Sequence, residues 1–205
     1  RNMSDLFVVQ DEIVAAINRT LQIQLGVGVG AIRAPGKQVN PRAYQNYLRG
    51  LELWGTRSDP RNRRDAIKTF QLVTVQDPDF ADGWAALGVS LVYSVPKVSG
   101  MTYQEHVTKA KKASERALEL DPENVRALAG LAVSLLKLDI KAATSLLERA
   151  VAIAPNSSLV HYASAWVYEF RGELARANLF YERAIALDPL NAVIKRVRTL
   201  HYNAI

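Results

Sequence analysis

Histidine is the residue type in this sequence best suited to acid–base or metal chemistry, and there are three: His106, His161 and His201. They are far apart in the chain and lack the short spacing that brings two side chains to one metal ion. There is no cysteine, which excludes disulfides, zinc–thiolate sites and cysteine nucleophiles. Helical register brings no serine, histidine and aspartate together as a catalytic triad. We therefore expect no catalytic residue, no metal, no cofactor and no enzyme activity in this chain.

A glycine-rich stretch within residues 26–40 is the one segment that could be considered for phosphate binding. A phosphate-binding loop needs two glycines separated by four residues, then lysine, then serine or threonine. Here five residues separate Gly30 from Gly36, and Gln38 follows Lys37. A predicted helix, not a strand, leads into the stretch. Residues 26–40 are therefore predicted to be a flexible linker.

The formal charge of +6 comes partly from two basic clusters. The residues are Arg57, Arg61, Arg63, Arg64 and Lys68 in the first cluster, and Lys195, Arg196 and Arg198 in the second. Such clusters can contact nucleic-acid phosphates, but a solvated helix face has the same composition. Because no aromatic residue is interleaved with either cluster, we favour the solvated face and expect no nucleic-acid partner.

The composition predicts a protein with a sizeable core: 49% of its 205 residues are apolar and 22% are charged. No apolar run approaches the roughly 18 residues of a membrane span, and no signal peptide is visible. The lack of cysteine suits a reducing compartment, so we expect a cytoplasmic location and leave the periplasm open. The chain begins at Arg1 and ends inside an apolar periodic segment, which suggests a fragment of a longer polypeptide.

The clearest organisation in the sequence is an internal repeat. Four similar segments, the last three of which contain Glu-Arg-Ala, end at Pro78, Pro122, Pro155 and Pro189, which are 44, 33 and 34 residues apart. A period near 34 is typical of a helix–turn–helix unit that stacks on its neighbours.

These units resemble the tetratricopeptide repeat (TPR). The second unit carries Trp84, Leu87, Gly88, Ala110, Ala117 and Pro122; the third Leu128, Leu131, Ala132, Ala143, Leu147, Ala150 and Pro155; the fourth Ala165, Tyr168, Ala177, Tyr181 and Ala184; and the first Tyr44, Tyr47, Leu51, Ala66, Phe70 and Pro78. The resemblance implies an all-α, right-handed TPR solenoid of about four helix pairs, with a long N-terminal helix and a C-terminal partial repeat. The TPR domain would span 41–205, with repeats at 41–78, 79–122, 123–155, 156–189 and a partial repeat at 190–205.

The second unit departs from the pattern by about ten extra residues within 92–101. A loop there could contact a ligand or could simply be tolerated at the edge of the solenoid. Thr102 and Glu105 have the spacing of a capping box that begins the next helix. Ser58 or Asp59, followed by Pro60, likewise predicts a helix start.

In TPR proteins the first helices of the repeats line a concave groove that binds extended peptides or partner helices. The resemblance places eight residues of this chain in that groove: Arg42, Gln45, Arg49, Asp82, Arg126, Tyr162, Trp166 and Glu169. The three arginines could pair with an acidic segment or a terminal carboxylate of a protein partner. Tyr162 and Trp166 could anchor a partner, or could instead pack against the next repeat, as we expect for His161.

Residues 1–25 predict one amphipathic helix with an apolar stripe, formed by Leu6, Val9, Ile13, Ile17, Leu21 and Leu25. The stretch 5–13 resembles a segment that precedes TPRs in multidomain bacterial regulators with a cyclase, winged-helix or kinase domain. We therefore predict a protein–protein interaction scaffold, a regulatory module of a larger bacterial signalling protein. The alternatives are a homo-oligomerisation module and the regulatory region of an adenylate or guanylate cyclase whose catalytic domain lies outside this chain. No membrane segment is expected.

Overall fold

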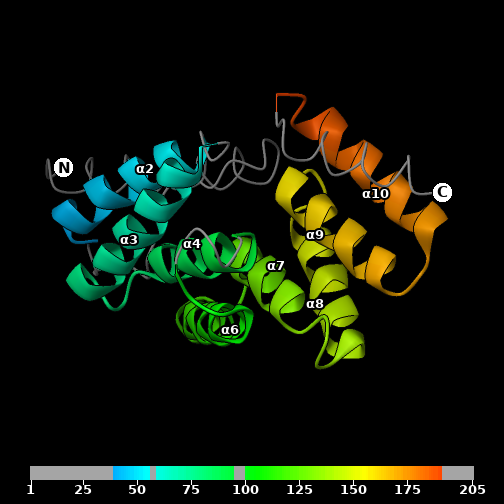
Figure 1. Cartoon of the computed structure of the whole chain (residues 1–205), viewed down its shortest axis with the longest axis horizontal. Helices are drawn as coiled ribbons and strands as arrows, with labels where there is room; N and C mark the ends of the chain where they lie inside the picture. Colours follow the sequence, from blue (N-terminus) through cyan, green and yellow to red (C-terminus); the bar gives the residue numbers. More distant parts are fainter. Residues whose placement is uncertain (1–38, 56–58, 95–99, 191–205) are drawn as a thin grey trace, which may run out of the picture.

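The computed structural model describes residues 39–55, 59–94 and 100–190, and all regular structure in these ranges is helical. The helices are α2 (Pro41–Gly55), α3 (Pro60–Gln76), α4 (Ala81–Val92), α6 (Tyr103–Leu120), α7 (Val125–Ser134), α8 (Ile140–Ile153), α9 (Ser158–Phe170) and α10 (Leu174–Leu187) (Figure 1). The predicted N-terminal helix (1–25), most of the linker (26–40) and the partial repeat (190–205, except Leu190) lie outside the described residues. None of the described helices is long and apolar enough to cross a membrane.

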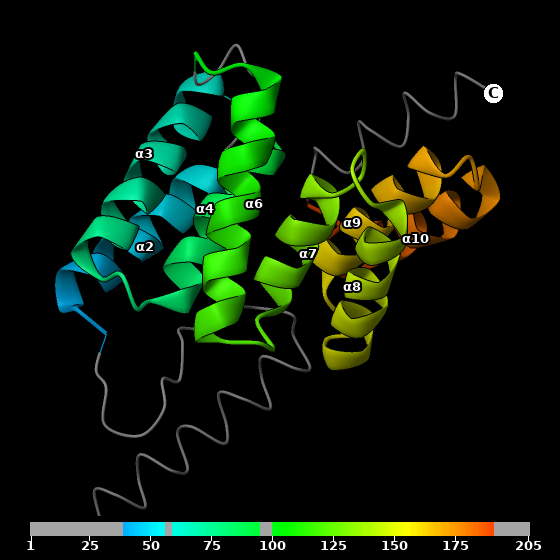
Figure 2. The same cartoon turned by 90° about the horizontal axis from the view of Figure 1, so that it is seen from below.

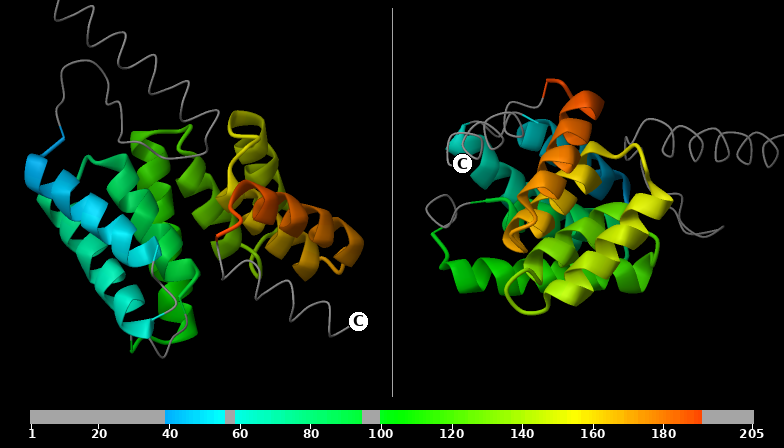
Figure 3. Two further views of the ribbon diagram at one scale, coloured as in Figure 1. Left: turned by 90° about the horizontal axis from the view of Figure 1, so that it is seen from above. Right: turned by 90° about the vertical axis from the view of Figure 1, so that its right-hand side faces the viewer.

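The helices form four consecutive antiparallel pairs: α2 with α3, α4 with α6, α7 with α8, and α9 with α10. Each pair packs on the first helix of the next one: α3 contacts α4, both α4 and α6 contact α7, and both α7 and α8 contact α9. Figure 2 shows the first two pairs on one side of the molecule and the last two on the other. In Figure 3, α2 and α10 lie at opposite ends of this stack. The predicted all-α repeat solenoid is confirmed.

The helix ends are set by residues that satisfy unpaired backbone N–H groups. Asp59 precedes α3 and its carboxylate accepts a 2.7 Å hydrogen bond from the backbone N–H two residues on, with Pro60 as the first helical residue. Thr102 and Glu105 form the expected capping box of α6, in which the backbone N–H of Thr102 donates to Oε2 of Glu105 at 2.7 Å. Gly172, with a φ of 78°, makes the turn between α9 and α10. Both predicted helix starts are confirmed.

Small residues let the helices of neighbouring pairs approach closely at Ser114 of α6. A Cβ atom on Gly88 of α4 would overlap the Ser114 Oγ atom and lie 3.2 Å from the Ala110 carbonyl oxygen. A Cβ atom on Gly130 of α7 would lie 2.8 Å from the same Oγ atom. Three helices thus meet at one point where a side chain at position 88 or 130 would overlap Ser114.

The first pair is held together by aromatic rings. Tyr47 of α2 and Phe70 of α3 are fully buried, as is Phe80 at the start of α4. The ring centroids of Tyr47 and Phe80 are 5.1 Å apart in an edge-to-face arrangement, and those of Tyr47 and Phe70 are 6.3 Å apart. These separations are favourable for aromatic pairs. The side chains of three helices therefore order the start of the solenoid.

Candidate partner-binding groove

The eight residues predicted to line the groove all lie on first helices of the pairs, on α2, α4, α7 and α9. Arg42, Gln45 and Arg49 of α2 are exposed, and Arg126 of α7 is half-buried. Within the described ranges, none of these three arginines forms an ion pair. Three positive charges on two first helices are thus without a carboxylate partner in the part of the chain that the structure describes.

Asp82 of α4 and Arg126 of α7 both influence the ionisation of Tyr47 on α2. Asp82 accepts a 2.8 Å hydrogen bond from the amide of Asn124, which also caps α7. Burial is the main cause that raises the pKa of Tyr47 to about 12; Arg126 lowers this pKa and Asp82 raises it, so both charges lie near the Tyr47 hydroxyl group. That hydroxyl oxygen is buried and has no hydrogen-bond partner among the described residues. Sequence reasoning had assigned neither Tyr47 nor Asn124 to the groove.

The aromatic residues predicted for the groove are engaged with other parts of the chain. Tyr162 is buried, and Trp166 is half-buried; their ring centroids are 5.7 Å apart. The ring centroid of Tyr162 lies 6.1 Å from that of Tyr181 on α10, the second helix of the same repeat. Both Tyr162 and Trp166 also contact Tyr93, at 5.3 and 5.2 Å. Sequence reasoning did not single out Tyr93, since it belongs to the extra residues rather than to a repeat position.

Glu169 holds the hydroxyl group of Tyr181, which donates a 2.6 Å hydrogen bond to Oε2 of Glu169. Burial is the largest cause that raises the pKa of Tyr181 above its ordinary range, followed by this hydrogen bond and the charge of Glu169, and the phenols of Tyr162 and Tyr93 raise it further. This hydrogen bond therefore links α9 to α10. A contact between Glu169 and a partner would be additional to it.

Comparison with solved structures shows which architecture this helix arrangement belongs to. TTC0263, described as a thermophilic TPR protein of Thermus thermophilus, superposes over 80% of this chain and 100% of its own, with a TM-score of 0.52 and 16% sequence identity. PilF of Pseudomonas aeruginosa superposes over 75% of this chain and 64% of its own, with a TM-score of 0.50 and 20% identity. The chain has the TPR fold. No protein-family model matches the sequence, and no curated protein matches it at a significant level.

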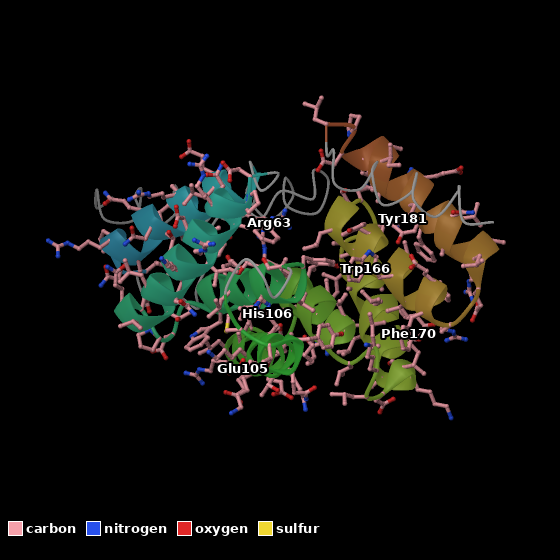
Figure 4. All side chains as sticks on the ribbon, in the orientation of Figure 1. Arg63, Glu105, His106, Trp166, Phe170 and Tyr181 are labelled. Atoms are coloured by element: carbon pink, nitrogen blue, oxygen red, sulfur yellow. The ribbon has the colours of Figure 1, made fainter. Side chains whose placement is uncertain are left out.

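In this TPR fold the two described histidines are bound to backbone carbonyl groups. His106 lies 3.0 Å from the Leu91 carbonyl oxygen through Nδ1, and His161 lies 2.8 Å from the Pro155 carbonyl oxygen through Nε2 (Figure 4 labels His106). Because a carbonyl oxygen only accepts, each of these ring nitrogens carries the proton. No group of histidine and acidic residues among the described residues is arranged to hold a metal ion. His161 packs as expected, with its ring 5.8 Å from that of Phe180.

The free energy of unfolding is expected to decrease as the pH is lowered, because His161 resists protonation in the folded chain. Burial is the main cause that lowers the His161 pKa, and the nearby charge of Arg183 lowers it too, while the hydrogen bond to Pro155 raises it. The Nδ1 atom, which would take the extra proton, is buried without a partner among the described residues. Below the ordinary pKa of about 6.5 the unfolded chain binds a proton that the folded chain resists. His161→Gln should therefore flatten the loss of unfolding free energy as pH falls below about 6.5, measured by urea unfolding; an unchanged pH dependence would contradict this.

Proposed function

We propose that this chain is a protein-interaction scaffold whose TPR groove binds an acidic segment of a partner protein. The observation that carries the proposal is the set of three arginines, Arg42, Arg49 and Arg126, without ion pairs among the described residues. A carboxylate of a partner can accept two parallel hydrogen bonds from a guanidinium group, a strong and directional contact. Arg126 is half-buried, so this contact is shielded from water more than a surface ion pair is.

The wider context follows from the resemblances in the sequence. The segment at residues 5–13 and the repeats after it support a regulatory module of a larger, cytoplasmic bacterial signalling protein. A cyclase, winged-helix or kinase domain elsewhere in that protein would then be the part that the scaffold regulates. The TPR fold supports the scaffold role, whereas the identity of the partner and of the attached domain rests on this proposal alone.

Reversing the charge of Arg49 and Arg126 is expected to weaken partner capture by about tenfold or more, equivalent to about 1.4 kcal/mol for each tenfold change. The double variant Arg49→Glu/Arg126→Glu replaces attraction by repulsion for an acidic segment. The bait is the whole chain, the readout is the amount of each captured protein, and far-UV circular dichroism confirms the helix content.

Lys112→Glu/Lys141→Glu is the matched control because it makes the same charge change at exposed positions of α6 and α8, which are second helices of their pairs. It should leave capture unchanged. Capture should also fall with added salt, since surface charges are screened over about 10 Å at 0.1 M. Equal capture by the wild type, the double variant and the control would rule out the arginine site. A mass that rises with concentration in sedimentation, lost in the double variant, would instead show that the partner is a second copy.

A further inference from the structure

Tyr93 makes a contact that a simple repeat solenoid does not have. In such a solenoid each repeat contacts only its neighbours. Tyr93 is the residue that ends α4 in the second pair, yet its ring contacts Tyr162 and Trp166 on α9 in the fourth pair. The contact with Trp166 is edge-to-face, with an interplanar angle of 75°. The contact between Tyr93 and α9 therefore joins the second pair to the fourth pair and passes over the third.

The third pair allows this crossing because its first helix carries small residues there. Ala129 and Val133 of α7 are almost fully buried, and Ala163 of α9 is fully buried in the same apolar cluster. The rings of Tyr93 and Trp166 both pack against the cluster that these three residues form. Larger side chains at Ala129 or Val133 would fill the space that the two rings occupy.

Tyr93 therefore sits in an aromatic seat, which we define as the surface formed by Tyr162, Trp166 and Tyr181. Tyr93 and Trp166 also pack on the cluster that contains Tyr162 and Tyr181 (Figure 4 labels Trp166 and Tyr181). Aromatic side chains are the class enriched where a partner binds most tightly. The contacts that Tyr93 makes are ring-to-ring contacts, which a ring from another chain can make equally well.

We propose that Tyr93 occupies in the unbound chain a seat for an aromatic side chain of the partner, so that the recognised segment combines acidic residues with a tyrosine or phenylalanine. This proposal rests on the proposed function. Arg42 and Arg49 of α2 and Arg126 of α7 receive the acidic part, and the seat on α9 and α10 receives the ring. The partner's ring replaces that of Tyr93, so little aromatic contact is lost in the exchange.

The seat is tested with p-cresol, which has the ring and hydroxyl group of tyrosine and no backbone. Protein labelled with 5-fluorotryptophan gives one fluorine resonance for each of Trp54, Trp84 and Trp166, assigned by Trp→Phe variants. Tyr93→Ala should bind p-cresol about tenfold more tightly than the wild type, because an emptied apolar cavity takes up a ligand of the same shape. The shift should appear at Trp166. Tyr93→Phe should behave like the wild type, since its ring still fills the seat.

Tyr103→Ala is the matched control, because Tyr103 is an exposed tyrosine at the other end of the extra residues. It should bind p-cresol no better than the wild type does. Should Tyr93→Ala lose its helical signal in circular dichroism, Tyr93→Leu provides the same comparison. The aromatic seat is wrong if Tyr93→Ala and the wild type bind p-cresol equally well. It is also wrong if the change in fluorine resonance is confined to Trp84.

The partner chemistry is tested with synthetic peptides in which an acidic run and a tyrosine are separated by a glycine spacer of varied length. Each peptide is paired with a version that has alanine in place of tyrosine. The best tyrosine peptide should bind about tenfold more tightly than its alanine version, and the advantage should vanish in Trp166→Ala. If the alanine version binds equally well and Arg126→Glu abolishes binding of both, the aromatic seat is wrong while the acidic-segment proposal stands. If Arg126→Glu leaves binding of both peptides unchanged, the proposed function fails.

Discussion

Phe70→Ala is expected to lower the free energy of unfolding by about 3–5 kcal/mol, the largest effect of any single substitution considered. Phe70 is fully buried, and its ring lies against Gly50 of α2, where an added Cβ atom would meet the ring at 2.5 Å. It also contacts the ring of Tyr47. Removing the ring would leave a cavity between α2 and α3 that two rigid helices cannot close fully.

Chemical denaturation followed by circular dichroism measures this loss. Leu72→Ala on the same helix is the control, because Leu72 is 45% exposed and its truncation should cost well under about 1 kcal/mol. Similar losses for the two variants would mean that Phe70 is not part of a close-packed core. Because a helix-repeat array can unfold in parts, the transition should be compared at two probes before a single free energy is derived.

Gly88→Ala is expected to lower the free energy of unfolding by about 1–2 kcal/mol, although alanine is a better helix former than glycine by about 1 kcal/mol. The added methyl group would overlap the Ser114 hydroxyl oxygen, and the backbone of α6 at Ala110 leaves it little room to move away. Stability measured by denaturation should therefore fall where helix propensity alone predicts a rise.

Ser114→Ala provides the test of the mechanism. The Ser114 hydroxyl oxygen is buried without a hydrogen-bond partner among the described residues, so its removal alone should stabilise the fold, by about 1 kcal/mol. In the Ser114→Ala background, Gly88→Ala should cost less than it does alone, because the atom that it overlaps is gone. Strictly additive effects of the two substitutions would contradict a direct contact between these positions.

Local chemistry in the sequence was enough to predict much of the fold. Asp59 with Pro60, and Thr102 with Glu105, start helices because their side chains satisfy backbone groups a few residues away, so the information is contained in a short window. The repeat pattern predicted the helix pairs for a similar reason. Small residues such as Gly88 are needed wherever two helices meet at the same place in each unit.

The candidate groove was less predictable, because its contacts join residues that no local pattern relates. The hydrogen bond from Asn124 to Asp82 depends on how α4 and α7 are placed side by side. Tyr93 lies outside the repeat pattern, and its contact with Trp166 spans two pairs, so periodicity carries no signal for it. Tyr162 is buried because the rings of Tyr93 and Tyr181 both pack against it. As contacts to a partner, the eight groove residues remain predictions.

The central claim is that Arg42, Arg49 and Arg126 of the first helices, which form no ion pair among the described residues, bind an acidic segment of a partner. The most direct test is the ratio of partner captured by Arg49→Glu/Arg126→Glu to that captured by Lys112→Glu/Lys141→Glu, with both variants fully helical. We predict a ratio of about one tenth or lower at low salt, rising towards one as salt is added, because the charge contacts are screened in both proteins. A ratio near one at low salt would contradict the claim.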